Sequence, residues 1–128
     1  MLKIIEPDVL IISETDLDGH ITYANQEFSD ACEFDVELMM GFRHNLIRAP
    51  DMPDWVFERM WSDIVNNKVW TGVVKNNTFN GDKVYWVKAV IVPKFNEKNE
   101  KIGYRSERRQ ATNEEISAAM KLYGVDID

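Results

Sequence analysis

The stretch from residue 44 to residue 53 reads His-Asn-Leu-Ile-Arg-Ala-Pro-Asp-Met-Pro, and a β-hairpin pattern lies on either side of it. A residue that precedes proline avoids the α region, so Ala49 and Met52 are not expected to lie within a regular helix. We therefore predict an irregular backbone here, with peptide groups free to contact a ligand. Arg48 and Asp51 stand three positions apart within it. They are read either as a ligand clamp or as a local salt bridge, and an exposed bridge contributes only about 0–1 kcal/mol.

Two dipeptides that favour tight turns divide the apolar, β-branched runs into hairpins. Asp18-Gly19 and Asn80-Gly81 are both typical of two-residue type I′ turns. Pro93 is expected to end its strand, and a polar loop should follow it. The predicted strands are 9–12, 21–23, 69–76, 83–92 and 102–109.

Helical patterns occur in two places between and after these strands. Short helices are expected within 26–40, with Asp35 as a cap, and an amphipathic helix is expected at 54–66, capped by Asp51 or Asp54. A capping box at 112–115 opens a last helix that ends at Gly124. Hairpins make neighbouring strands antiparallel, so the fold class is α+β, with helices on one face of the sheet and a pocket between them.

Composition excludes several classes of function. The chain has 128 residues, 22 acidic and 15 basic side chains, and a net charge of -7, which argues against a nucleic-acid binder. It is long enough for one domain, which we place at residues 9–123 between an N-terminal segment (1–8) and a C-terminal tail (124–128). One cysteine, and no signal peptide or long apolar run, indicate a cytoplasmic protein without membrane insertion.

One face of the strand 69–76 carries residues that suit a planar ligand. Period-two alternation places Trp70, Gly72, Val74 and Asn76 on that face, which combines a flat ring, a position without a side chain and an amide. The alternative is that Trp70 belongs to the core and Asn76 begins a turn. Asn25 is likewise either a helix N-cap or an amide donor to a ligand.

The chain has few residues of the types that commonly act in catalysis or bind metals. His20 and His44 have no second ligand at metal spacing, and Cys32 shares a helical face with Phe28, as an inert buried thiol would. No catalytic triad order, phosphate loop or zinc-protease pattern occurs. The sequence therefore predicts neither an enzyme nor a metal site.

Three stretches together resemble a PAS domain. Residues 20–28 read His-Ile-Thr-Tyr-Ala-Asn-Gln-Glu-Phe, and residues 70–86 run from Trp-Thr-Gly-Val-Val-Lys-Asn to Tyr-Trp-Val. Residues 44–53 are similar to the Pro-His-Asn-x-x-Arg-His-Pro-Asp-Met-Pro motif of the aerotaxis-receptor subfamily. The resemblance extends from about residue 10 to residue 123 and implies a five-stranded antiparallel sheet with short helices packed on one face.

In that subfamily the domain binds FAD noncovalently, senses redox state and signals to a chemotaxis receptor. The resemblance implies FAD, with FMN less expected, and a partner that is a methyl-accepting chemotaxis-type receptor or a HAMP or signalling domain at the inner face of the membrane. A homodimer is also compatible with it. The flavin-site positions that it implies are Arg48, Asp51, Trp70, Asn76, Asn25, His44 and Asn45.

The chain departs from the subfamily pattern at Ala49, where the motif has His, and at 41–43, where Gly-Phe-Arg replaces Gly-x-Pro. The Asn-Cys-Arg-Phe string of light-sensing flavin domains is missing, so no photoadduct is expected. Helix 54–66 has no histidine to ligate haem. Two alternatives remain: a cofactor-free PAS module for dimerisation or docking, and a small-metabolite sensor.

Overall fold

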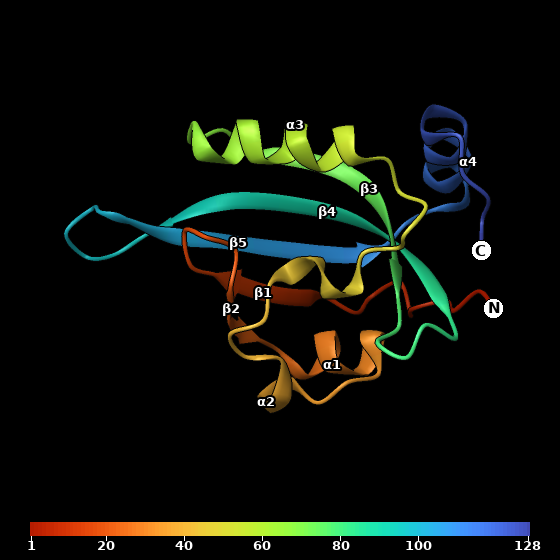
Figure 1. Cartoon of the computed structure of the whole chain (residues 1–128), viewed down its shortest axis with the longest axis horizontal. Helices are drawn as coiled ribbons and strands as arrows, with labels where there is room; N and C mark the ends of the chain where they lie inside the picture. The colour runs from red at the N-terminus through yellow and green to blue at the C-terminus, as the bar shows by residue number, and fades with distance from the viewer.

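A five-stranded antiparallel sheet forms the centre of the protein (Figure 1), and the computed structural model describes all residues from 1 to 128. The strands are β1 (Ile11–Thr15), β2 (Ile21–Ala24), β3 (Trp70–Asn77), β4 (Val84–Phe95) and β5 (Lys101–Gln110). Their order across the sheet is β2-β1-β5-β4-β3. The last strand therefore lies between the first hairpin and the second, and it joins two segments that are far apart in sequence.

The helices follow the predicted order. They are α1 (Gln26–Cys32), α2 (Val36–Met39), the short 3₁₀ helix η1 (His44–Ile47), α3 (Asp54–Val65) and α4 (Asn113–Tyr123). In Figure 1, α3 runs along β3 and β4, α1 and α2 lie near β1 and β2, and α4 stands at one end of the sheet. The predicted α+β fold, with short helices on one face of an antiparallel sheet, is confirmed.

The sheet separates two hydrophobic clusters. The larger contains Val87 and packs under α1, η1 and α3, whereas the smaller surrounds Trp86 and packs under α4. Trp86 and Val87 are adjacent in β4 and both fully buried, because successive side chains of a strand point to opposite faces. One end of the outer face is thus covered by the last helix.

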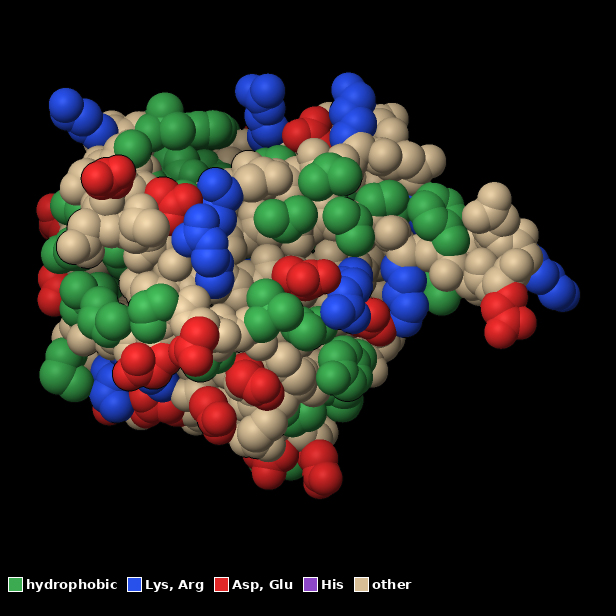
Figure 2. Space-filling view, turned by 180° about the vertical axis from the view of Figure 1, so that it is seen from behind, with side chains coloured by type: hydrophobic (Ala, Val, Ile, Leu, Met, Phe, Trp, Pro, Cys, Tyr) green, Lys and Arg blue, Asp and Glu red, His purple; other side chains and the backbone are tan.

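Acidic, basic and apolar side chains are interspersed on the back of the molecule (Figure 2).

The helix caps were partly predicted from sequence. Asn25 caps α1, Asp35 caps α2, and Thr112 forms the predicted capping box of α4. The cap predicted for α3 was wrong: Pro53 occupies the N-cap position, and neither Asp51 nor Asp54 caps the helix. Proline fixes a backbone dihedral that suits the first residues of a helix, so α3 begins without a side-chain cap.

Both hairpin connections are longer than the predicted type I′ turns. A type I′ turn requires positive φ at both central residues, and here only Gly19 and Gly81 have it, whereas Asp18 and Asn80 do not. In the first connection, Asp16 Oδ1 accepts hydrogen bonds from the amides of residues 18 and 20, which stabilises a wider loop.

Pro93 does not end its strand, contrary to the sequence prediction. Strand β4 continues to Phe95 and pairs with β5, with Pro93 opposite Tyr104. On its other side, β4 has no partner beyond Ile91, where the pairing with β3 stops. Proline cannot donate a ladder hydrogen bond, and it is tolerated here because this side of the strand is an edge.

None of the helices combines the length and apolar character needed to cross a lipid bilayer.

Candidate functional site

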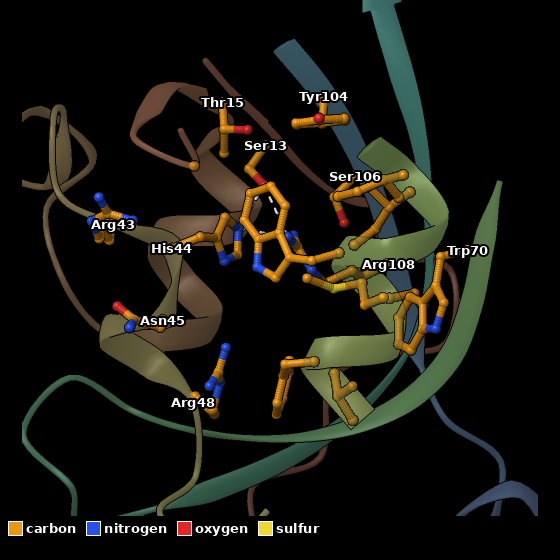
Figure 3. A pocket seen from close by; sticks show the side chains of 18 of the residues that line it. Ser13, Thr15, Arg43, His44, Asn45, Arg48, Trp70, Tyr104, Ser106 and Arg108 are labelled. Atoms are coloured by element: carbon orange, nitrogen blue, oxygen red, sulfur yellow. Dashed lines mark hydrogen bonds between the residues drawn. The ribbon is translucent and has the colours of Figure 1, made fainter. Parts of the chain in front are cut away.

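A pocket lies between the sheet and the elements η1 and α3 (Figure 3). Its volume is about 140 Å³, measured as the space open to the centres of water-sized molecules. Its lining combines aromatic and aliphatic residues with a small set of polar and basic side chains.

Strand β3 supplies the apolar wall. Trp70, Val74 and Asn76 line the pocket, as the alternation of the strand predicted. The indole of Trp70 lies across Gly72, because a Cβ atom added there would come within 2.4 Å of the ring. Any larger residue at position 72 would displace the tryptophan. The Trp70 ring can therefore lie flat over the strand, because Gly72, two residues further on, has no side chain, as the sequence suggested.

Helix α3 forms the opposite wall. Phe57, Met60, Trp61 and Ile64, whose spacing predicted the amphipathic helix, all line the pocket. Trp61 reaches as far as the β1–β2 loop, where its ring would lie 3.0 Å from a Cβ atom at Gly19. This ring also packs edge-on against Tyr104, with ring centroids 5.6 Å apart.

Arg48 enters the pocket directly after η1. Its guanidinium lies 3.4 Å from the centroid of the Phe57 ring, and its Nε has no hydrogen-bond partner in the protein. The backbone of Arg48 forms an isolated β-bridge with Asn76 of β3. The irregular segment is thereby attached to the edge of the sheet at the same residue whose side chain enters the pocket. Burial lowers the pKa of the Arg48 guanidinium, although the group stays charged near neutral pH.

A polar cluster, composed of the buried residues Ser13 and Arg108 and the partly buried His44, forms the inner end of the pocket (Figure 3). Arg108 Nη2 lies 2.9 Å from Ser13 Oγ and 2.6 Å from His44 Nε2, and the Ser13 hydroxyl lies 2.8 Å from the same nitrogen. Because a guanidinium can only donate, His44 Nε2 accepts and the imidazole proton resides on Nδ1.

Burial sets the charges in this cluster. It lowers the pKa of His44 to about 3, with the nearby positive charge of Arg108 as the next cause. Burial also lowers the pKa of Arg108 to about 10. At neutral pH the cluster therefore contains one guanidinium and one neutral imidazole, with no carboxylate in contact with either.

Three buried side-chain atoms in the protein have no hydrogen-bond partner, and all three belong to residues of this pocket. They are Arg48 Nε, Ser106 Oγ and Arg108 Nη1. Leaving a buried donor unpaired costs about 1–3 kcal/mol. The only acidic residue in the lining is Asp18, at the loop. Two unpaired guanidinium donors between aromatic walls suit a planar ligand that is rich in hydrogen-bond acceptors or carries negative charge.

Five of the seven sequence-predicted site residues meet in this pocket. Arg48, Trp70, Asn76, His44 and Asn45 line it. Trp70 and Asn76 are also well buried, so for Trp70 the core interpretation and the ligand-facing interpretation both describe the residue.

The other two predicted residues have different positions. Asn25 lies outside the lining: its Oδ1 accepts from the amides of Phe28 and Ile12, which makes it a helix cap and a tie to β1. Asp51 also lies outside the pocket, and the proposed salt bridge with Arg48 does not form. Its carboxylate instead accepts from Lys75 Nζ at 2.8 Å.

Sequence reasoning missed the polar residues of β5 and β1. Arg108 and Ser106 face the pocket from β5, and Ser13 faces it from β1. The alternation of β5 held a signal, since an arginine shares a face with Tyr104 and Ser106. Its neighbours on both sides are charged, however, so no local pattern distinguished the inward arginine from the outward ones. Cys32 is fully buried and outside the pocket, and burial raises the pKa of its thiol, in keeping with an inert residue.

Comparison with known proteins agrees with this architecture. No family model matches the chain. The chain is 41% identical over 116 residues to the aerotaxis receptor of Escherichia coli K12, a match that covers 91% of this chain and 22% of the receptor. The PAS residues quoted from the sequence thus lie within a long stretch of clear relatedness. The chain is a PAS domain of the aerotaxis-receptor kind.

Solved structures show the same fold for this PAS domain. A PAS domain from Colwellia psychrerythraea superimposes with a TM-score of 0.66 at 23% identity, over 80% of this chain and 86% of that one. The light-state light-oxygen-voltage domain of the blue-light photoreceptor aureochrome 1 gives 0.74 at 13% identity, with 91% of both chains covered. An RNA-binding light-oxygen-voltage receptor gives 0.74 at 18% identity, over 92% of this chain and 35% of the receptor. At these identities the likeness concerns the fold alone.

Proposed function

We propose that this PAS domain binds a flavin noncovalently in the pocket, FAD in preference to FMN, and senses redox state. The observation that carries the proposal is that Arg48 and Arg108 line an aromatic-walled pocket without a carboxylate partner, each with one buried N–H group left unpaired. An isoalloxazine is planar and apolar at one end and presents carbonyl and nitrogen acceptors at the other. The relationship to the aerotaxis receptor supports the same ligand.

The residues of the pocket fit such a group. Trp70 and Phe57 would pack against its apolar surface, and Asn76 would offer an amide that can both donate and accept. Arg48 and Arg108 would hold its acceptor groups. A bound flavin supplies reversible electron transfer, while the protein positions it and tunes its potential.

The chain's own residues limit what this pocket does to a ligand. His44 is neutral at physiological pH and its Nε2 already accepts from Arg108, so it provides no acidic proton there. The single cysteine lies in α1 outside the lining, so no pocket thiol is available to form an adduct. These features favour a noncovalent cofactor that is read through charge and hydrogen bonding.

For the output, we propose that the domain signals to a methyl-accepting chemotaxis-type receptor or a HAMP or signalling domain, at the cytoplasmic face of the membrane. The chain spans about a fifth of the receptor that it matches. The signal would be a population shift between two conformations of the domain, biased by the state of the pocket.

The test is the absorption spectrum of the purified protein, followed by chromatographic identification of any nucleotide released by heat. A flavin spectrum with FAD released is the expected result. Arg48→Ala and Trp70→Ala should both lower flavin occupancy. Trp55→Ala is the matched control, because Trp55 is half exposed on α3 and outside the pocket.

Two results would point elsewhere. A colourless protein that takes up neither FAD nor FMN on reconstitution would contradict the proposal and support a docking or dimerisation module. The same absence of flavin, together with thermal stabilisation by an organic acid or aromatic metabolite, would indicate a metabolite sensor. Full flavin occupancy in both pocket variants would reject the site assignment while leaving the family unchanged.

A further inference from the structure

Lys75 is a lysine with almost no exposed surface. Its side chain is 2% exposed, and it lies on the face of β3 opposite the pocket. Its ammonium donates to Asp51 Oδ2 at 2.8 Å and to the main-chain oxygens of Asp126 at 3.1 Å and Asp128 at 3.4 Å. Three donors meet three acceptors, and Asp51 is the only one of them that contributes a side chain.

Trp86 completes the same site from the neighbouring strand. It is the register partner of Lys75 across the β3–β4 ladder, and its indole Nε1 donates to the carbonyl of Ile127 at 2.7 Å. Lys75 and Trp86 therefore bind the main-chain oxygens of three consecutive residues of the C-terminal tail. A further hydrogen bond, from the Tyr123 hydroxyl to Val73, fastens the end of α4 to the same strand.

The backbone of Lys75 faces the other way, toward the proline-rich segment. The amide of Ala49 donates to the carbonyl of Lys75 at 3.2 Å, and Arg48 bridges to Asn76, the next residue of β3. Asp51 belongs to this segment as well. One lysine thus contacts the segment that carries Arg48 into the pocket and, through its ammonium, the tail that follows α4.

We propose that Lys75 and Asp51 couple the ligand pocket to the C-terminal tail, with Asp51 as the positioning residue. The carboxylate of Asp51 does not contact the tail and is itself about half exposed. Its effect passes through the ammonium, because a buried charge that loses the carboxylate side chain paired with it is strongly destabilised. Lys75 can then be rehydrated only if the tail that covers it moves away. Asp51, which the family motif associates with the cofactor, would therefore act on the tail and not directly on the ligand.

The test uses the full chain with Asp51→Asn and follows the indole N–H of Trp86 and the backbone amides of residues 125–128 by NMR hydrogen exchange. In Asp51→Asn, these groups should exchange at least about tenfold faster than in the wild type, because the tail opens locally. Trp86→Phe assigns the indole signal among the four tryptophans.

Two variants serve as controls. Asp54→Asn removes a neighbouring carboxylate that forms no ion pair, and Asp126→Asn alters the tail charge while keeping the carbonyl that Lys75 uses. Both should exchange like the wild type. Unchanged Trp86 exchange in Asp51→Asn, or an equal acceleration in Asp54→Asn, would overturn the coupling.

The role of the pocket in this coupling rests on the proposed flavin site, and FAD itself is the probe. FAD binding should change the exchange of the Trp86 indole in the wild type and have less effect in Asp51→Asn. FAD that binds without changing the tail would refute the link to the pocket. If FAD does not bind, the flavin proposal fails, and the Asp51→Asn comparison alone decides whether the lysine holds the tail.

Discussion

The arginines on the two faces of β5 have opposite surroundings. Arg105 and Arg109 lie on the outer face and are paired with glutamates: Arg105 with Glu14 and Glu107, and Arg109 with Glu115. These hydrogen bonds raise the pKa of both guanidinium groups. Arg108, between them in sequence, faces the pocket, contacts no carboxylate, and has its pKa lowered by burial.

This difference is informative because the protein has acidic residues in excess. The chain has 22 carboxylate side chains and 15 basic ones, so there are enough carboxylates to pair with every basic group. In the folded protein, however, none of them forms an ion pair with Arg48 or Arg108. Sites that are costly to the free protein are typical of functional positions. The outer arginines therefore form ion pairs on the surface of the sheet, whereas Arg48 and Arg108 are, in our proposal, available to a ligand.

The largest expected effect concerns ligand affinity. Arg48→Ala and Arg108→Ala should each weaken FAD binding roughly 10- to 100-fold, because each removes a charge-assisted hydrogen bond. Arg105→Ala and Arg109→Ala should leave the dissociation constant almost unchanged. Fluorescence titration with FAD measures both pairs, and equal losses on the two faces would remove the distinction between them.

The second effect concerns pH. Unfolded His44 has an ordinary pKa near 6.5, whereas in the folded protein burial lowers it to about 3. Below pH 6.5 the unfolded chain therefore binds the additional proton, and the free energy of unfolding should fall by about 1.4 kcal/mol per pH unit as the pH decreases.

Urea denaturation between pH 7 and about pH 5 measures this slope, a window above the range in which the carboxylates with lowered pKa values titrate. His44→Asn should remove most of it, and His20→Asn, outside the pocket, should retain it. A slope that persists in His44→Asn would show that the inner cluster is not the source.

A smaller effect is expected for the stability of the ligand-free protein. Arg108→Met should leave the free energy of unfolding unchanged or raise it by about 1 kcal/mol, since it removes a buried charge without a counter-charge. Ser13 and His44 keep their mutual hydrogen bond in this variant. Arg109→Met should instead lower stability by about 0.5–1 kcal/mol through loss of its pair with Glu115. Thermal unfolding compares the two, and a large destabilisation by Arg108→Met would identify that residue as structural.

The smallest effect is that of salt. About 1 M NaCl shortens the Debye length to about 3 Å and screens exposed ion pairs. The destabilisation caused by Arg109→Met should therefore shrink, while the effect of Arg108→Met should be the same at low and high salt. Urea midpoints of both variants at two salt concentrations provide the measurement.

The sequence by itself determined the local structure and much of the pocket wall. Hairpin dipeptides, the spacing of Phe57 and Ile64, and the Thr112 capping box depend on neighbours within a few residues, and they predicted the strands and helices. The alternation of β3 likewise placed Trp70 and Asn76 on one face.

Only the tertiary structure decided what meets across the sheet. Arg108 contacts Ser13 across 95 positions of sequence and His44 across 64, and Lys75 contacts Asp51 across 24 positions and Asp126 of the tail across 51. No local period records such contacts, because those of Arg108 depend on the placement of β5 between β1 and β4, and those of Lys75 on the packing of distant segments against β3. The same long-range order explains why Asp51 pairs with a lysine 24 positions away and not with its neighbour Arg48.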